Sequence, residues 1–93
     1  MQNRKISIEI ETVRSGQPRP YADSHYEYIL TVEGMSEHEV KAYCTKILRP
    51  HSQTRAEWVA GKTNEACYFS GYYTFDKVAE NKYKYYVMQP FCD

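Results

Sequence analysis

The sequence has no excess of charge of either sign, because 12 lysine and arginine residues balance 12 aspartate and glutamate residues among 93. A nucleic-acid coat protein is normally basic and a DNA mimic strongly acidic, so the composition fits neither class. Cysteine is also scarce: Cys44, Cys67 and Cys92 are odd in number and far apart, unlike a secreted disulfide framework. We therefore expect reduced thiols and a cytoplasmic protein.

Long apolar runs are absent as well. Met1–Arg14 alternates polar and apolar residues and has no continuous apolar segment of the kind found in a signal peptide. No stretch approaches the ~20 apolar residues that a membrane span needs, so we expect no membrane partner. The length and the 42% hydrophobic content are typical of one soluble domain, which predicts a single domain over residues 1–93.

No motif for catalysis or metal binding is present. The sequence contains no GxSxG, no HExxH and no phosphate-binding glycine loop, and its histidines and cysteines lack the spacing of zinc ligands. We expect no metal, no cofactor, no small-molecule substrate and no enzyme activity. One alternative stays open, because two histidines and a lysine can cleave a phosphodiester by acid–base chemistry. A small ribonuclease or toxin would use His25, His51 and Lys41.

Alternation of polar and apolar residues predicts strands along much of the chain. Three isoleucines alternate with polar residues in Lys5–Val13, and tyrosine, leucine and valine alternate with polar residues in His25–Glu33. Three further strands are predicted in the C-terminal half, a short one followed by two longer ones: Ala56–Ala60, Glu65–Phe75 and Lys82–Gln89.

One amphipathic helix is predicted over Glu37–Leu48. Ser36 stands three residues before Glu39, which is the spacing of a capping box, and Pro50 ends the segment. Its apolar stripe consists of Val40, Tyr43, Cys44, Ile47 and Leu48. The predicted fold class is therefore α+β, with the order β-β-α-β-β-β, a single antiparallel sheet and the amphipathic helix packed on one face.

The cationic residues are unevenly distributed along this neutral chain. Residues 21–40 contain five acidic side chains and no lysine or arginine, whereas residues 41–62 are mainly basic. The helix macrodipole explains part of this pattern. The remaining cations predict a basic patch that contacts RNA phosphates or an acidic protein surface. The predicted basic set is Arg14, Arg19, Lys41, Lys46, Arg49, Arg55 and Lys62.

Tyrosine is the aromatic residue in excess, with 10 tyrosines against 3 phenylalanines and 1 tryptophan. Adjacent strand residues point to opposite faces, so one residue of each pair Tyr72/Tyr73 and Tyr85/Tyr86 should lie on the face that the helix leaves uncovered. We take Tyr72 and Tyr86 as candidate partner-binding residues, with ordinary strand packing as the alternative. The same face is expected to carry Glu9, Glu11, Glu27, Ile29, Thr31, Lys82, Lys84 and Tyr86.

In size and style, a small neutral domain with one helix on an antiparallel sheet and no enzyme motif resembles the proteins that phages use to disable host defences, particularly anti-CRISPR proteins of the type I systems. The resemblance implies a non-catalytic inhibitor in the host cytosol. It would block a ribonucleoprotein surveillance complex by steric contact with protein and RNA. The alternative is a domain that binds nucleic acid directly.

Overall fold

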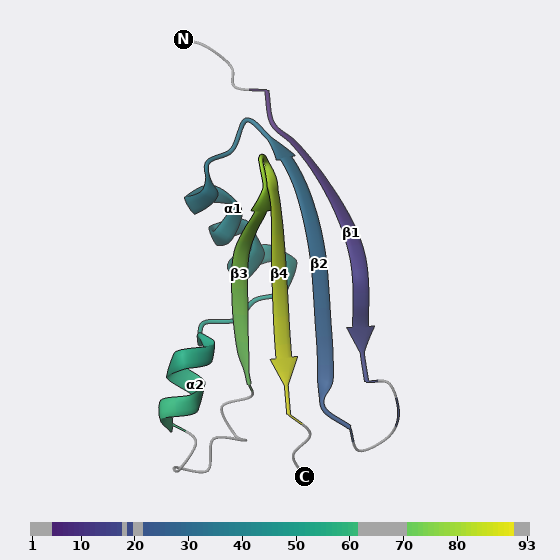
Figure 1. The fold of residues 1–93 in the computed structure, drawn as a ribbon, viewed down its shortest axis with the longest axis vertical. Helices are drawn as coiled ribbons and strands as arrows, with labels where there is room; N and C mark the ends of the chain where they lie inside the picture. The colour runs from purple at the N-terminus through teal and green to yellow at the C-terminus, as the bar shows by residue number, and fades with distance from the viewer. Residues whose placement is uncertain (1–4, 18, 20–21, 62–70, 91–93) are drawn as a thin grey trace.

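A four-stranded antiparallel sheet forms the body of the protein (Figure 1). The computed structural model describes residues 5–17, 19, 22–61 and 71–90, and the structural statements below concern these residues. The sheet has the order β1-β2-β4-β3, so the second and last strands are central. Its strands are β1 (Ser7–Gly16), β2 (Ser24–Glu33), β3 (Tyr72–Ala79) and β4 (Lys82–Gln89).

Two helical segments accompany the sheet. Helix α1 (Glu37–Tyr43) continues into a π-helical turn, η1 (Cys44–Leu48), and this unit packs on one face of the sheet. Helix α2 (Arg55–Gly61) lies beside β3, outside the sheet edge (Figure 1). No helix in the described part of the chain has the length and apolar character that crossing a membrane requires.

The predicted helix and its cap are confirmed. The backbone N–H of Ser36 donates to Glu39 Oε1 at 2.9 Å, and the N–H of Glu39 donates back to Ser36 Oγ at 3.2 Å. This capping box satisfies donors that the first turn of a helix would otherwise leave unbonded. At the other end the N–H of Arg49 donates to the carbonyl of Cys44, five residues back, which gives η1 its wider π turn.

The helix covers one face of the sheet and forms the core there. Tyr28 is paired with Tyr85 and Leu30 with Tyr83 across β2 and β4, and all four side chains are buried. They pack with Val32, Val87 and Tyr73 from the sheet and with Val40 and Cys44 from the α1–η1 unit. The α+β class, the antiparallel sheet and the helix on one face are therefore as predicted.

One predicted strand is wrong: Ala56–Ala60 belongs to helix α2. Thr54 begins this helix with a second capping arrangement, in which its N–H donates to Glu57 Oε1 at 2.8 Å and the N–H of Glu57 donates to Thr54 Oγ1 at 3.3 Å. The Thr-x-x-Glu spacing repeats the signal at Ser36, and it overrides the short apolar stretch around Trp58, which by itself favours a strand. The described order is thus β-β-α-α-β-β.

The remaining strand boundaries agree in part. β4 has the predicted bounds, β2 begins one residue earlier, and β1 is shifted toward the loop, to Ser7–Gly16. The first part of the predicted Glu65–Phe75 strand, up to residue 70, lies outside the described residues. β3 extends to Ala79, beyond the predicted end at Phe75.

Candidate functional site

The face of the sheet opposite α1 is not covered by a helix, and we call it the open face. Residues paired across an antiparallel sheet share a face, so the register identifies its members. They include all eight residues predicted for the uncovered side. The members used below are Glu9, Glu11 and Arg14 on β1, His25, Glu27, Ile29, Thr31 and Glu33 on β2, Tyr72 and Asp76 on β3, and Lys82, Lys84, Tyr86 and Met88 on β4.

Four aromatic side chains form a row across this face, which we call the aromatic row. Trp58 of α2 lies 5.4 Å from Tyr72 between ring centroids, and Tyr72 lies 6.2 Å from Tyr86. Tyr86 in turn stacks on His25 at 5.9 Å. The row therefore runs across the strands, from α2 through β3 and β4 to β2, and it contains both tyrosines predicted for this side.

The row also has a packing role. Met88 is paired with both His25 and Tyr72, which places it on the open face, yet its side chain is only 7% exposed. Its two cross-strand partners are both members of the row. The rings of the row contact one another across the strands, and a ring fixed in this way loses less conformational entropy when a partner binds.

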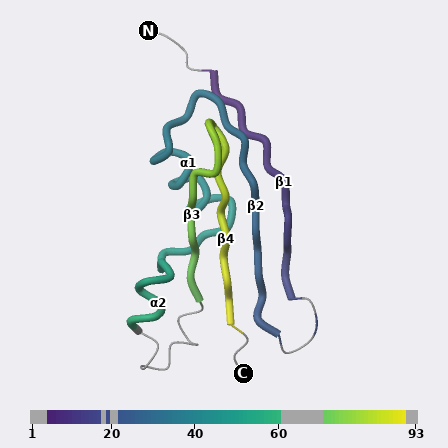
Figure 2. The backbone as a smooth tube through the Cα atoms, viewed as in Figure 1, coloured from purple at the N-terminus to yellow at the C-terminus, as the bar shows by residue number. Residues whose placement is uncertain are grey.

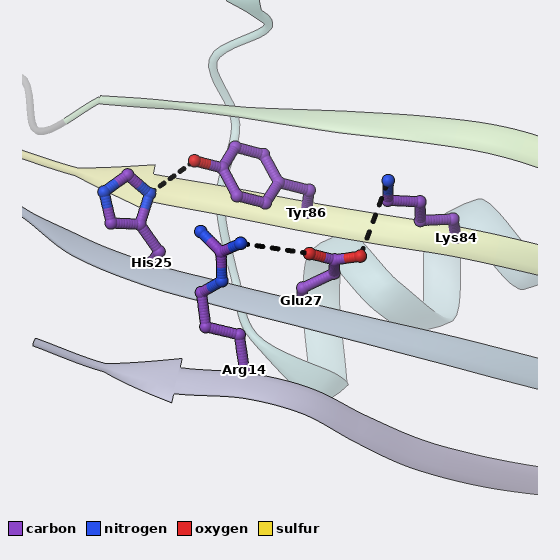
Figure 3. A network of polar contacts seen from close by, with 5 residues as sticks. All are labelled: Arg14, His25, Glu27, Lys84 and Tyr86. Atoms are coloured by element: carbon purple, nitrogen blue, oxygen red, sulfur yellow. Dashed lines mark hydrogen bonds and ion pairs between the residues drawn. The ribbon is translucent and has the colours of Figure 1, made fainter. Parts of the chain in front are cut away.

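At the β2 end of the row, Tyr86 and His25 are joined by a short hydrogen bond. Tyr86 Oη and His25 Nδ1 are 2.5 Å apart (Figure 3). Burial raises the pKa of Tyr86 above that of an ordinary tyrosine, and the neighbouring Tyr72 raises it further. The phenol therefore keeps its proton at neutral pH and is able to donate it to the imidazole nitrogen.

A charge cluster lies beside this pair (Figure 3). Glu27 Oε2 is 3.4 Å from Lys84 Nζ, and Glu27 Oε1 is 4.0 Å from Arg14 Nη2. The Glu27 side chain is 16% exposed, whereas those of Arg14 and Lys84 are 56% and 42% exposed. Exposed ion pairs contribute little to stability, about 0–1 kcal/mol each. The cluster instead places the cationic groups of Arg14 and Lys84 beside the aromatic row, where a partner can contact them.

A shallow depression of about 270 Å³ lies at the end of β1 and β2. It is lined by Arg14, Ser15, Gly16, Gln17 and His25. The depression therefore lies between His25, the last ring of the aromatic row, and Arg14 on β1. Aromatic rings, an arginine and an adjacent hollow are features enriched in protein contact sites.

Two members of the predicted basic set lie on the helix-covered side instead. Arg49 Nε donates to Tyr28 Oη at 3.0 Å, and its guanidinium carbon lies 3.5 Å from the centroid of the Tyr26 ring. Lys41 Nζ lies 5.9 Å from the centroid of the buried Tyr73 ring. These contacts hold the α1–η1 unit against the sheet. Because Tyr26 and Tyr28 alternate with Glu27, Arg49 and Arg14 are on opposite faces.

The other basic residues are dispersed. Arg19 lies in the β1–β2 loop, Lys46 lies on η1 and Arg55 begins α2, and all three are exposed. Arg55 lines an open apolar depression of about 560 Å³ with Ala56 and Val59. Lys62 lies outside the described residues. The structure therefore does not bring the described members of the basic set together in one patch.

The catalytic alternative is not assembled either. His25 belongs to the open face, whereas the His51 ring lies 6.3 Å from that of Tyr73, a member of the core beneath the α1–η1 unit. His51 Nδ1 accepts a hydrogen bond from the N–H of Gln53 at 3.2 Å. Lys41 also lies over Tyr73, so His25 is separated from the other two residues by the sheet.

Cysteine offers no reactive group among the described residues. Burial raises the pKa of the Cys44 thiol to about 12, so it stays protonated in the core as predicted. Cys67 and Cys92 lie outside the described residues. Within the described ranges, no group of three or more His, Cys, Asp or Glu side chains has an arrangement suited to a metal ion.

Sequence reasoning missed three parts of the site. The sequence pattern predicts a strand at Trp58, and it identifies His25 only as a candidate acid–base group. It predicts the correct face for Glu27 and Lys84 but not the ion pair between them. The two-residue period that linked His25 with Glu27 was available in the sequence, whereas the position of Trp58 depends on the docking of α2. No protein-family model, no curated protein and no solved structure matches this chain.

Proposed function

We propose that this protein is a non-catalytic binding protein that contacts a partner protein through the open face, with the aromatic row at the centre of the contact. The proposal rests on one observation: the row lies on the face that has no helix over it, beside Arg14 and the ion pair between Glu27 and Lys84. Tyrosine, tryptophan and arginine carry most of the binding energy at protein interfaces.

The charges of the open face favour a protein partner over a nucleic acid. Five carboxylates stand against three cations there. A surface that binds polyphosphate needs a net positive potential, because phosphate neutralisation supplies most of the affinity. A protein surface of mixed polarity is complementary to such a face. The charged groups are Glu9, Glu11, Glu27, Glu33, Asp76, Arg14, Lys82 and Lys84.

The resemblance to type I anti-CRISPR proteins supplies the class of partner. We propose that the protein occupies a protein surface of a host ribonucleoprotein surveillance complex in the cytosol and blocks it sterically. The neutral composition favours a steric block over mimicry of DNA. RNA of the complex would be reached by Arg14 at the end of the row, where the guanidinium is exposed.

The experiment compares Arg14→Glu with the matched charge reversal Lys46→Glu. Both side chains are exposed, and the 4.0 Å pair of Arg14 with Glu27 is weak, so both variants should fold. Binding to a purified type I surveillance complex is measured by biolayer interferometry. We expect about a 30-fold loss of affinity for Arg14→Glu, the effect of a hot-spot residue, and none for Lys46→Glu. Equal affinities of the two variants would refute the open face as the contact surface. If the unmodified protein does not bind, the surveillance complex is not its partner.

Direct nucleic-acid binding is the second candidate, because Tyr72 and Tyr86 lie on neighbouring strands where successive bases could stack. It predicts that the protein retards naked single-stranded RNA at low salt, and that Tyr72→Ala removes the shift. An absence of retardation at low salt would eliminate this candidate.

A further inference from the structure

One edge of the sheet is covered by another segment of the chain, and the other edge is not, in the part of the chain that the structure describes. At the β3 edge, the N–H of Tyr73 donates to the carbonyl of Gln53 at 3.0 Å, and Gln53 Nε2 donates to the carbonyl of Gly71 at 2.6 Å. A bridge between Thr54 and Tyr73 extends this cover. At the other edge, β1 has no neighbour on its outer side among the described residues (Figure 2).

β1 has the length and regularity of a strand that can accept another. It spans ten residues, and its pairing with β2 is unbroken from Ser7 to Thr12, where a bulge follows. An edge strand presents a row of backbone N–H and C=O groups that template the pairing of a further strand. Natural proteins usually protect such edges, so a long regular edge is a candidate docking surface.

The α1–η1 unit leaves the apolar side of this strand only partly covered. Ile8 packs against the core, but Ile10 is 39% exposed and Ile6, just before the strand, is 51% exposed. An added strand with apolar residues on that side would remove these surfaces from water, which is favourable in proportion to the area buried.

The opposite side of β1 is acidic. Glu9 and Glu11 line a depression of about 210 Å³ with Lys82, and Glu9 also lines one of about 360 Å³ with Glu33 and Glu80. Carboxylates thus outnumber cations four to one around these two depressions. A partner strand needs basic residues on this side for charge complementarity.

A second copy of the chain is the competing occupant of this edge. In an antiparallel pair that sets Ile10 opposite its own copy, Glu9 would face Glu11 of the other chain twice, and like charges directly opposite each other destabilise a sheet. In the register that sets Ile8 opposite its own copy, Glu11 would face Lys5 and this repulsion is absent. The acidic side of the strand favours a basic partner segment over a copy whose own strand is acidic, and sedimentation of the protein alone tests the second copy.

We propose that the outer edge of β1, over Ser7–Thr12, binds an extended segment of a partner protein as a fifth strand, with basic residues beside Glu9 and Glu11 and apolar residues beside Ile10. This surface is distinct from the aromatic row. The proposal goes beyond the function proposed above, because it assigns a second docking surface and the chemistry of its occupant.

The test uses three synthetic ten-residue peptides with blocked ends. In the first, lysine alternates with valine; in the second, glutamate replaces lysine; the third is the lysine peptide with every backbone amide N-methylated, so that neither edge has N–H donors for strand pairing. Titrations followed by amide NMR shifts and hydrogen exchange report both affinity and location. We expect the lysine peptide to bind at least 10-fold more tightly than the other two and to protect amides of Ser7–Thr12.

Charge reversal provides the matched variants. Glu9→Lys/Glu11→Lys should invert the preference, so that the glutamate peptide binds more tightly, while Glu37→Lys on α1 should leave it unchanged. Equal binding of all peptides, protection at the aromatic row, or a dimer of the protein alone in sedimentation would overturn the proposal. Arg14→Glu tests the open face alone: it should weaken the contact with the partner complex and leave peptide pairing with Ser7–Thr12 intact. Glu9→Lys/Glu11→Lys tests the strand edge, because it should change the peptide preference.

Discussion

Arg49 fastens the end of η1 to the sheet, and its replacement by alanine should weaken the whole domain. Its Nε donates to Tyr28 Oη at 3.0 Å, and a hydrogen bond from a charged donor contributes about 1.5–3 kcal/mol. Its guanidinium lies 3.5 Å from the Tyr26 ring centroid, a contact that contributes about 0.5–2 kcal/mol. Because Arg49 is only half-buried, values near the lower ends apply, and we expect a total loss of about 2–3 kcal/mol.

That loss is large for a domain of this size, whose free energy of unfolding is typically about 5–10 kcal/mol. It corresponds to a fall in Tm of roughly 8–24 °C, at about 4–8 °C per kcal/mol. Urea unfolding followed by circular dichroism measures the free energy, and a thermal scan measures Tm. Lys46→Ala, an exposed cation on the same turn, is the control and should change the free energy by less than about 0.5 kcal/mol.

A double-mutant cycle isolates the hydrogen bond. Tyr28→Phe removes only the hydroxyl, so Arg49→Ala should cost about 1.5 kcal/mol less in the Tyr28→Phe background than in the unmodified protein. If Arg49→Ala unfolds within 0.5 kcal/mol of the unmodified protein, or if the cycle shows no coupling, then Arg49 is not a structural residue. It would then return to the set of cations available to a partner.

Three further outcomes follow from local geometry. Gly71→Ala should destabilise the fold by at least about 2 kcal/mol more than Gly16→Ala in urea unfolding, because both glycines have positive φ but only at Gly71 would a Cβ meet a backbone oxygen, at 1.6 Å. Cys44 should stay unlabelled by iodoacetamide in the native protein and react once urea unfolds it, as peptide mass mapping would show; labelling of the native protein would contradict its burial. The pKa of Glu57 should lie below that of an ordinary glutamate in an NMR titration, chiefly because the Thr54 backbone donates to it. A lowered pKa means that Glu57 supports α2 above its ordinary pKa and that this support is lost as the pH falls through the lowered value; an ordinary pKa would contradict the cap.

Much of the fold follows from local patterns in the sequence. The two-residue period of β2 and β4 places Tyr28 and Tyr85 inside and Glu27 and Tyr86 outside, and the register confirms each of these positions. The Ser36 cap likewise predicts the start of α1, because a cap depends only on residues three apart. Strand alternation and helix caps depend on residues close together in the sequence, so they are predictable without knowledge of the tertiary structure.

Short segments were less predictable. The stretch around Trp58 has apolar residues and β-branched Val59, which suit a strand as well as one helical turn. The cap at Thr54 and the docking of α2 beside β3 decided in favour of the helix. Local propensity is a weak preference, and tertiary packing regularly overrides it in segments of this length.

The sequence by itself determined which residues of a strand share a face, and therefore that one residue of each pair Tyr72/Tyr73 and Tyr85/Tyr86 would lie on the face that the helix leaves uncovered. Only the tertiary structure decided that Trp58 and His25 complete a row with Tyr72 and Tyr86, that Arg14 and Arg49 lie on opposite faces, and that one sheet edge is covered while β1 is bare. Alternation along a strand is a property of neighbouring residues, fixed by backbone geometry. Contacts between distant segments depend on how those segments pack, and residue spacing along the chain does not encode that directly.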